Sequence, residues 1–180
     1  GENHDEILSS AEVAMYAAKA AKITYLQYDK SLDVGKLKRL ELTSNFKTAA
    51  DENQFILYYQ PQINFTSKEI TNVEALIRWL HPLHGLIQPN DFIELAEESG
   101  HISIITNWLI IHSFNQLREW HNNNHKIGIS INISAQDLQN KDILDTIETE
   151  LKKLKIDPAF ITIEITESSI MLYTNDTSAA

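Results

Sequence analysis

Short apolar segments alternate with longer amphipathic ones over residues 51–180. The spacing of apolar positions predicts four strands, at residues 54–60, 69–79, 126–134 and 160–167. It predicts three helices, one capped by Asn90-Asp91, one over 104–120 and one over 142–155. Pro61 is expected to end the first strand, the polar stretch 64–68 to form a hairpin turn, and Gly100 to close the first helix. Strands that alternate with helices are typical of βαβ units and a parallel sheet.

Residues 1–50 follow a different pattern. Ser9 and Glu12 form a capping-box signature, which predicts a helix that opens there and runs through Lys22. The β-rich segment 24–28 follows, and residues 31–52 then form a charged helical stretch. One helix and one short strand cannot bury a core alone, so we expect residues 1–30 to be the end of a larger domain and residues 31–50 to be a linker helix.

Composition and charge exclude several classes of protein and of functional site. The chain of 180 residues is 43% hydrophobic and 22% charged, which is typical of a folded protein. Its formal net charge of -10 argues against binding to DNA or RNA. The apolar run 102–114 is too short and too polar to span a membrane, so we expect a cytoplasmic protein, with an anchor upstream of Gly1 left open. Cysteine is absent, which rules out a thiolate metal site or cysteine nucleophile.

Three predicted strands contain a polar residue where a buried strand should be apolar. These residues are Glu74, Asn132 and Glu164. A buried carboxylate must be paired, protonated or bound to a metal. In a parallel barrel the carboxyl ends of the strands meet at one mouth, where these oxygens could bind Mg²⁺ or Mn²⁺. The alternative for each residue is a solvated strand end or an ion pair.

Arg78 and Glu167 are further candidates near the same strand ends. Arg78 lies an even number of residues after Glu74, so both side chains share one face of a strand. It could bind a phosphate through two hydrogen bonds, or pair with Glu74 or Glu164. Glu167 could support the metal ligands from a loop beyond the strand, with helix capping as its alternative.

Other residue types give weaker indications. His81 and His84 flank a turn and are expected in a loop. The serines lack a nucleophile elbow, and no glycine-rich phosphate loop is present. The three tryptophans, Trp79, Trp108 and Trp120, are expected in the core rather than as stacking platforms.

Four segments together resemble the EAL family of cyclic di-GMP phosphodiesterases. They are Tyr58-Tyr59-Gln60-Pro61, Glu74-Ala75-Leu76-Ile77-Arg78-Trp79, Ser130-Ile131-Asn132-Ile133-Ser134 and Glu164-Ile165-Thr166-Glu167. The resemblance covers about residues 40–171, and the segments occur in the family's order. Upstream, residues 11–19 resemble the closing helix of a GGDEF domain, a common neighbour of EAL domains.

The resemblance implies an α/β fold, a modified TIM barrel with one antiparallel strand, here truncated after about the fourth strand. It implies metal-dependent hydrolysis of cyclic di-GMP to pGpG. By motif match, the ligands of Mg²⁺ or Mn²⁺ would be Glu74, Asn132 and Glu164, and Arg78 would bind the substrate phosphate. Glu167 would shape the site beside the metals, and Gln60 and Leu76 would line the nucleotide pocket.

The same resemblance predicts the domain organisation. Residues 1–30 would be the end of a GGDEF domain, 31–50 a linker helix, and 51–180 the N-terminal part of an EAL domain. The family also needs aspartates, a lysine, a glutamate and a glutamine from later strands, so we expect this chain alone to be inactive. Two alternatives are a non-catalytic cyclic di-GMP sensor and an interaction module. EAL domains commonly form homodimers, and Leu37, Leu40 and Phe46 of the linker helix offer a second dimer contact.

Overall fold

The computed structural model describes residues 4–20, 23–30, 32–138 and 140–165. The chain divides into two compact units, Gly1–Asn45 and Phe46–Ala180. Each unit is described by itself. Among the described residues, none of the helices has the length and hydrophobicity of a membrane-spanning segment.

The first unit contains α1 (His4–Ala20) and the beginning of α2 (Leu32–Asp51). The predicted N-cap at Ser9 is wrong, because no glycine or proline interrupts residues 4–8 and the helix already includes them. Ser9 instead accepts a hydrogen bond of 2.9 Å from the Lys36 amine. The expected strand at 24–28 is also wrong, because the described residues of this unit offer it no partner strand.

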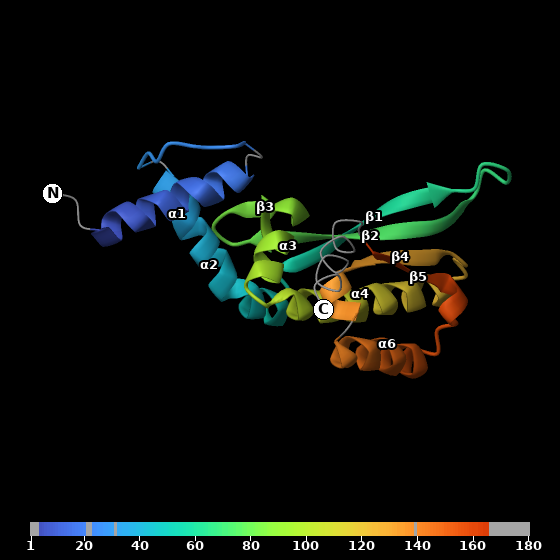
Figure 1. The fold of residues 1–180 in the computed structure, drawn as a ribbon. Coiled ribbons are helices and arrows are strands. Elements are labelled where there is room, and N and C mark those ends of the chain that lie inside the picture. The colour runs from blue at the N-terminus through green and yellow to red at the C-terminus, as the bar shows by residue number, and fades with distance from the viewer. Residues whose placement is uncertain (1–3, 21–22, 31, 139, 166–180) are drawn as a thin grey trace, which may run out of the picture. The chain divides into compact units, whose positions relative to one another are not determined.

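The second unit is built on a five-stranded mixed sheet (Figure 1). Its strands are β1 (Phe55–Ile63), β2 (Ile70–His81), β3 (Gly85–Ile87), β4 (Gly128–Ile133) and β5 (Ile161–Ile165). The order is β1-β2-β4-β5, with β3 beside β2. β1 and β3 run antiparallel to β2, whereas β4 and β5 continue the sheet in parallel. The α/β fold class is therefore confirmed, and β3 is a second antiparallel strand beside the one that was expected.

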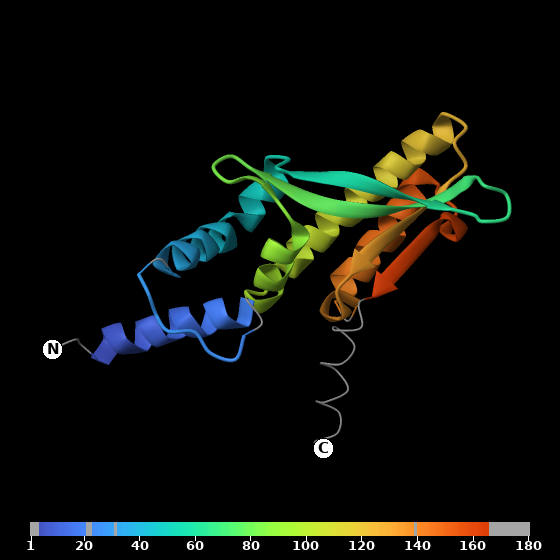
Figure 2. The same ribbon diagram turned by 90° about the horizontal axis from the view of Figure 1, so that it is seen from above.

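β1 does not end at Pro61 as predicted. It continues to Ile63, with Pro61 opposite Val73. Among the described strands β1 pairs only with β2, and an edge strand tolerates proline because its nitrogen can face away from the partner. The predicted hairpin turn is confirmed: the Asn64 side chain accepts hydrogen bonds from the backbone N–H groups of Thr66 and Ser67. Figure 2 shows the hairpin extending from the sheet.

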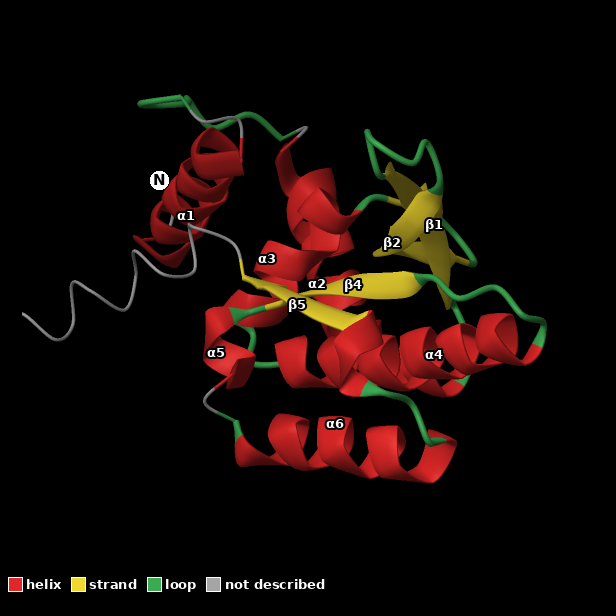
Figure 3. Ribbon diagram, turned by 90° about the vertical axis from the view of Figure 1, so that its right-hand side faces the viewer, coloured by secondary structure: helices red, strands yellow, loops and turns green. Residues whose placement is uncertain are grey.

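The helices of this unit are α3 (Pro89–Glu98), α4 (Ile102–Asn122), α5 (Ala135–Leu138) and α6 (Lys141–Leu154), with a 3₁₀ turn at Pro158–Phe160. α3 begins at Pro89 rather than after an Asn90-Asp91 cap, because proline is favoured at the first helical position. Gly100, at a φ of 71°, follows the end of α3 as predicted. α4 covers one face of the sheet and α6 packs on the outer side of α4 (Figure 3).

Apolar side chains from β2 and β4 form the core with α4. The buried set comprises Val73, Ala75, Ile129, Ile131 and Ile133 from the strands, Leu109, Ile110, Phe114 and Leu117 from α4, and Ile143 and Ile156. A second, aromatic cluster surrounds the Trp79 indole, which donates a 3.0 Å hydrogen bond to Gln54. Phe46, Phe55 and Phe92 contact the Trp79 ring. Trp79 and Trp108 are thus core residues, as predicted, and Trp120 is half-buried against Tyr59.

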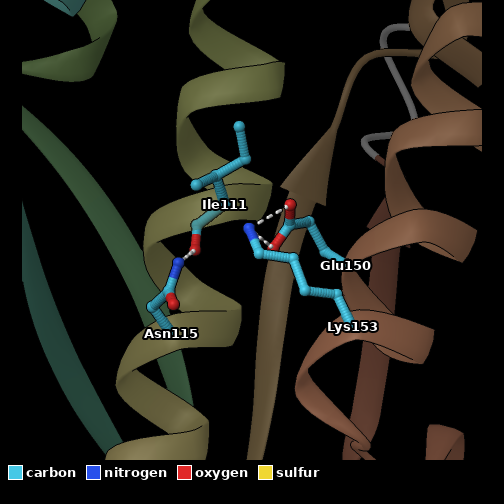
Figure 4. A network of polar contacts seen from close by, with 4 residues as sticks. All are labelled: Ile111, Asn115, Glu150 and Lys153. Atoms are coloured by element: carbon cyan, nitrogen blue, oxygen red, sulfur yellow. Dashed lines mark hydrogen bonds and ion pairs between the residues drawn. The ribbon is translucent and has the colours of Figure 1, made fainter.

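One buried acid in α6 is paired within its own helix. Glu150 is 7% exposed, and the Lys153 amine donates to its two carboxylate oxygens at 2.9 and 3.1 Å. Figure 4 shows this pair beside α4, where the Asn115 amide donates to the Ile111 carbonyl at 2.7 Å. The pairing allows an acidic side chain to be buried beside α4 without an uncompensated charge.

Gly128 begins β4 at a point where a side chain would not fit. A Cβ there would lie 2.5 Å from Oδ1 of Asn72 and 3.1 Å from the Phe160 carbonyl oxygen. Asn72 is itself held by two bonds of 2.8 Å, from its amide to the side chains of Gln62 and Ser130. Gly128 therefore lets β2 and β4 approach with a polar side chain between them.

Two carboxyl groups hold the segment that follows β4, which consists of Ser134 and α5. Asp137 is 2% exposed and accepts a 2.5 Å hydrogen bond from the Thr106 hydroxyl of α4. Burial raises the pKa of Asp137, and the Thr106 bond opposes that rise. Burial also raises the pKa of Glu97 on α3, against a lowering hydrogen bond with Ser134, while Asp137 and Glu94 add to the rise. The end of β4 is thus tied to α3 and α4.

Gly128→Ala is expected to lower the free energy of unfolding by about 1–3 kcal/mol, because the new methyl group must displace Asn72 and break its bonds. Urea unfolding followed by tryptophan fluorescence tests this, since all three tryptophans lie in the second unit. Gly35→Ala is the control, because its new Cβ meets nothing within 4 Å; its unfolding is followed by circular dichroism, since the first unit has no tryptophan. Equal midpoints for both variants would contradict the prediction.

Asp137→Asn is expected to flatten the dependence of stability on pH. A carboxyl with a raised folded pKa binds more protons folded than unfolded, so stability falls as pH rises from its ordinary value of 3.8 to the raised value. Each unit by which the pKa is raised corresponds to about 1.4 kcal/mol of free energy of unfolding that is lost at higher pH. Asp137→Asn removes this loss, because asparagine does not titrate.

Urea unfolding at a series of pH values measures the effect. Thr106→Val should widen the pH range over which stability falls, because it removes the hydrogen bond that holds the pKa of Asp137 down. Parallel pH profiles for the unsubstituted chain and Asp137→Asn would refute this account.

Candidate functional site

The side chains of β2 alternate between two environments. Val73, Ala75, Ile77 and Trp79 are buried on the face that contacts the helices. Glu74, Leu76 and Arg78 are half-buried on the opposite face, as the period of a strand requires. This opposite face of the sheet is here called the polar face.

The register of the strands brings the predicted residues to the polar face. Gln60 of β1 lies opposite Glu74, and Glu74 lies opposite Ser130 of β4. Two residues further along β4, Asn132 lies opposite Glu164 of β5. Residues directly opposite each other on neighbouring strands point to the same side of a sheet. Four side chains from four strands therefore share one face.

Glu74 and Asn132 are in direct contact. The Asn132 amide nitrogen donates a 2.7 Å hydrogen bond to a carboxylate oxygen of Glu74. Both side chains are half-buried, as is Glu164 on the next strand. Two carboxylates and one amide carbonyl on adjacent strands supply hard oxygen donors, the type that Mg²⁺ and Mn²⁺ bind. The donor set therefore fits such a cation.

Charge on the sheet is concentrated at this face. The five strands contain only three residues of the Asp, Glu, Lys and Arg type, which are Glu74, Arg78 and Glu164. Within the described residues, Arg78 has no carboxylate partner, so the expected alternative of an ion pair with Glu74 or Glu164 is not found. Its guanidinium donates a 2.8 Å bond to the Ile77 carbonyl and lies 5.3 Å from the centre of the Tyr58 ring.

The sequence also predicted site roles for Leu76, Gln60 and Glu167. Leu76 is half-buried on the polar face opposite Tyr58, and Gln60 is exposed near Glu74. Glu167 lies outside the described residues. Ser130 is buried and accepts a hydrogen bond from Asn72, which agrees with a structural rather than a nucleophilic serine.

Tyr58 was given no role in the sequence analysis, although its position could have been inferred. It precedes Gln60 by two residues, so strand alternation puts both side chains on the polar face. Its contact with Arg78 depends on the register between β1 and β2, which the sequence alone did not fix.

His81 is a correction to the expected loop position. It is the last residue of β2, is 3% exposed, and its ring contacts Trp79 at 5.2 Å between ring centres. The turn at Pro82 is shorter than expected because β3 pairs back onto β2 at His81. Nδ1 of His81 accepts a 3.2 Å hydrogen bond from the Leu83 backbone, so the imidazole helps to form that turn.

The first unit contains a hollow of about 1120 Å³ beside α1. Its lining comes from α1 and residues 23–30, with few charged groups. None of the polar-face residues contributes to it, so it offers no comparable set of ligands.

The chain is similar in sequence and fold to known proteins. Residues 43–180 match the family model of the EAL domain. Signaling protein YkoW of Bacillus subtilis (strain 168) is 36% identical over 92% of this chain and 21% of its own length. The bifunctional diguanylate cyclase/cyclic di-GMP phosphodiesterase MucR of Pseudomonas aeruginosa is 32% identical over 95% of this chain and 25% of its own length. The chain thus spans about a quarter of these relatives.

A solved structure, the PaMucR phosphodiesterase in a complex with c-di-GMP, resembles this fold with a TM-score of 0.68 and 32% identity. The likeness covers 76% of this chain and 56% of that one. The family match includes every described strand of the sheet and most of the chain. The chain belongs to the EAL domain family.

Proposed function

We propose that this chain forms part of a phosphodiesterase that hydrolyses cyclic di-GMP to pGpG. The observation that carries the proposal is the polar face, where the only two acids and the only Arg or Lys of the five strands lie together. MucR, a relative with this activity in its name, and the PaMucR complex with c-di-GMP support the choice of substrate. In the reaction, a water oxygen bonds to phosphorus, the bond from phosphorus to O3′ breaks, and O3′ leaves with a proton.

The acids and the amide of the polar face would hold the metal. Glu74, Asn132 and Glu164 offer oxygen donors from three adjacent parallel strands. When bound, Mg²⁺ or Mn²⁺ polarises the phosphoryl group and assists the attack of water. Without a cation, the two carboxylates would repel an anionic substrate, so the same residues favour substrate only in the metal-loaded protein.

The residues of the chain would then bind and orient the dinucleotide. Arg78 donates hydrogen bonds to a phosphate oxygen, which matters in a chain whose net charge is -10. The hydrogen bond from Asn132 fixes the direction of the Glu74 carboxylate. Gln60 and Leu76 contact the nucleotide beside the phosphate, and Glu167 supports the site from beyond β5.

We propose the following organisation. Residues 1–30 are the end of a GGDEF domain, residues 31–50 a linker helix, and residues 51–180 the N-terminal part of the EAL domain. The similarity to MucR, a bifunctional cyclase and phosphodiesterase, extends over 95% of the chain and supports this order. The protein acts in the cytoplasm and forms a homodimer through the EAL domain or the linker helix, without contact to nucleic acid or membrane in this chain.

Glu74→Gln in the full-length protein is expected to lower kcat for cyclic di-GMP by at least about 100-fold, because it removes a ligand charge and leaves the side-chain size unchanged. Chromatographic separation of cyclic di-GMP and pGpG in Mn²⁺, Mg²⁺ or EDTA measures this. Activity should appear only with a divalent cation. Glu148→Gln is the matched control, since Glu148 is an exposed residue of α6 that pairs with Lys152.

Two results would contradict the proposal in different ways. Tight binding of cyclic di-GMP without hydrolysis in either metal would assign the protein to the non-catalytic sensors. Failure both to bind and to hydrolyse would remove cyclic di-GMP as the ligand of the polar face.

A further inference from the structure

Within the described part of the chain Arg78 makes two contacts, and neither of them neutralises its charge. One Nη atom donates to the carbonyl of the preceding residue, Ile77, at 2.8 Å. The guanidinium carbon lies 5.3 Å from the centre of the Tyr58 ring. This distance is within the range of a cation–π contact. Neither contact places a carboxylate beside the guanidinium.

The choice of an aromatic partner has a chemical consequence. A carboxylate beside Arg78 would take its N–H donors and cancel its charge, so a phosphate would have to displace it. A tyrosine ring restricts the side chain through its face and leaves the remaining N–H groups available. An arginine side chain otherwise loses much rotamer freedom on binding, which weakens the complex.

The sheet fixes the relative position of the two residues. Tyr58 lies opposite Leu76, two residues from Arg78 along β2, and Ile56 lies directly opposite Arg78. Tyr58 is thus the diagonal cross-strand neighbour of Arg78 on the polar face, a pairing within reach of two long side chains. Tyr58 is 49% exposed, so it does not serve as a core residue.

We propose that Tyr58 is a positioning residue that orients Arg78 for the phosphate of cyclic di-GMP. This inference rests on the proposed function. Tyr58 acts through the arginine and not by its own contact with the nucleotide. The aromatic ring, and not its hydroxyl group, supplies the effect.

A double-mutant cycle in the full-length protein tests the inference, with cyclic di-GMP as the probe. Tyr58→Leu should raise KM roughly three- to tenfold with kcat changed less, the size expected for a lost cation–π contact. Tyr58→Phe should keep the unsubstituted KM, because the ring remains. In an Arg78→Ala background, Tyr58→Leu should cause no further rise.

The control variant is Phe65→Leu. Phe65 is 87% exposed in the hairpin turn and has a similar contact, with the Lys68 amine 5.9 Å from its ring centre, away from the polar face. Phe65→Leu should leave KM unchanged, and the midpoints of thermal unfolding of all variants should agree.

Three outcomes distinguish failure of the positioning role of Tyr58 from failure of the proposed phosphodiesterase function. An unchanged KM in Tyr58→Leu overturns the positioning role while hydrolysis by the unsubstituted protein keeps the proposed function. A further rise in the Arg78→Ala background shows that Tyr58 contacts the nucleotide itself and also overturns the inference. No binding or hydrolysis by the unsubstituted protein refutes the proposed function itself.

Discussion

The packing of α4 against one face of β2 and β4 is the contact on which the rest of this structure depends. Burial of Val73, Ala75, Ile129 and Ile131 beneath α4 fixes which side of each strand is turned inward. A shift of one residue in register would put Glu74 into the apolar core and Val73 on the open face. The cost of burying that carboxylate excludes the shift. The hydrophobic core thereby determines the composition of the polar face.

The sequence was sufficient to predict a helix or strand wherever one face of it is apolar and its ends carry common turn or capping residues. β1, β2, β4, β5, α4, α6, the hairpin turn at Asn64 and the closing Gly100 were all predicted, and strand parity anticipated that Glu74 and Arg78 share a face. Two of the errors show how local signals competed with context. Pro61 was expected to end β1, but the strand lies at an edge of the described sheet. Residues 24–28 have high β propensity, but the described residues of the first unit contain no strand with which they could pair.

Other features could not be predicted because they depend on which residues meet across elements. β3 contains three residues and is defined only by its pairing with β2. The bond between Asn132 and Glu74 joins residues 58 positions apart in the chain. Asp137 is acidic in sequence and was not singled out, yet it is almost fully buried beside Thr106. These contacts require the three-dimensional register, which periodicity does not provide.

The close approach at Gly128 has a consequence for how this family can vary. Asn72 and Gly128 lie on different strands, and the Asn72 side chain fills the space that a side chain at position 128 would need. The residue tolerated at one position therefore depends on the residue at the other. Natural homologues with a side chain at the position of Gly128 should carry a shorter residue in place of Asn72. Homologues that retain asparagine there should retain glycine. The two positions form an epistatic pair, and in an alignment they should covary although 55 residues separate them in the chain.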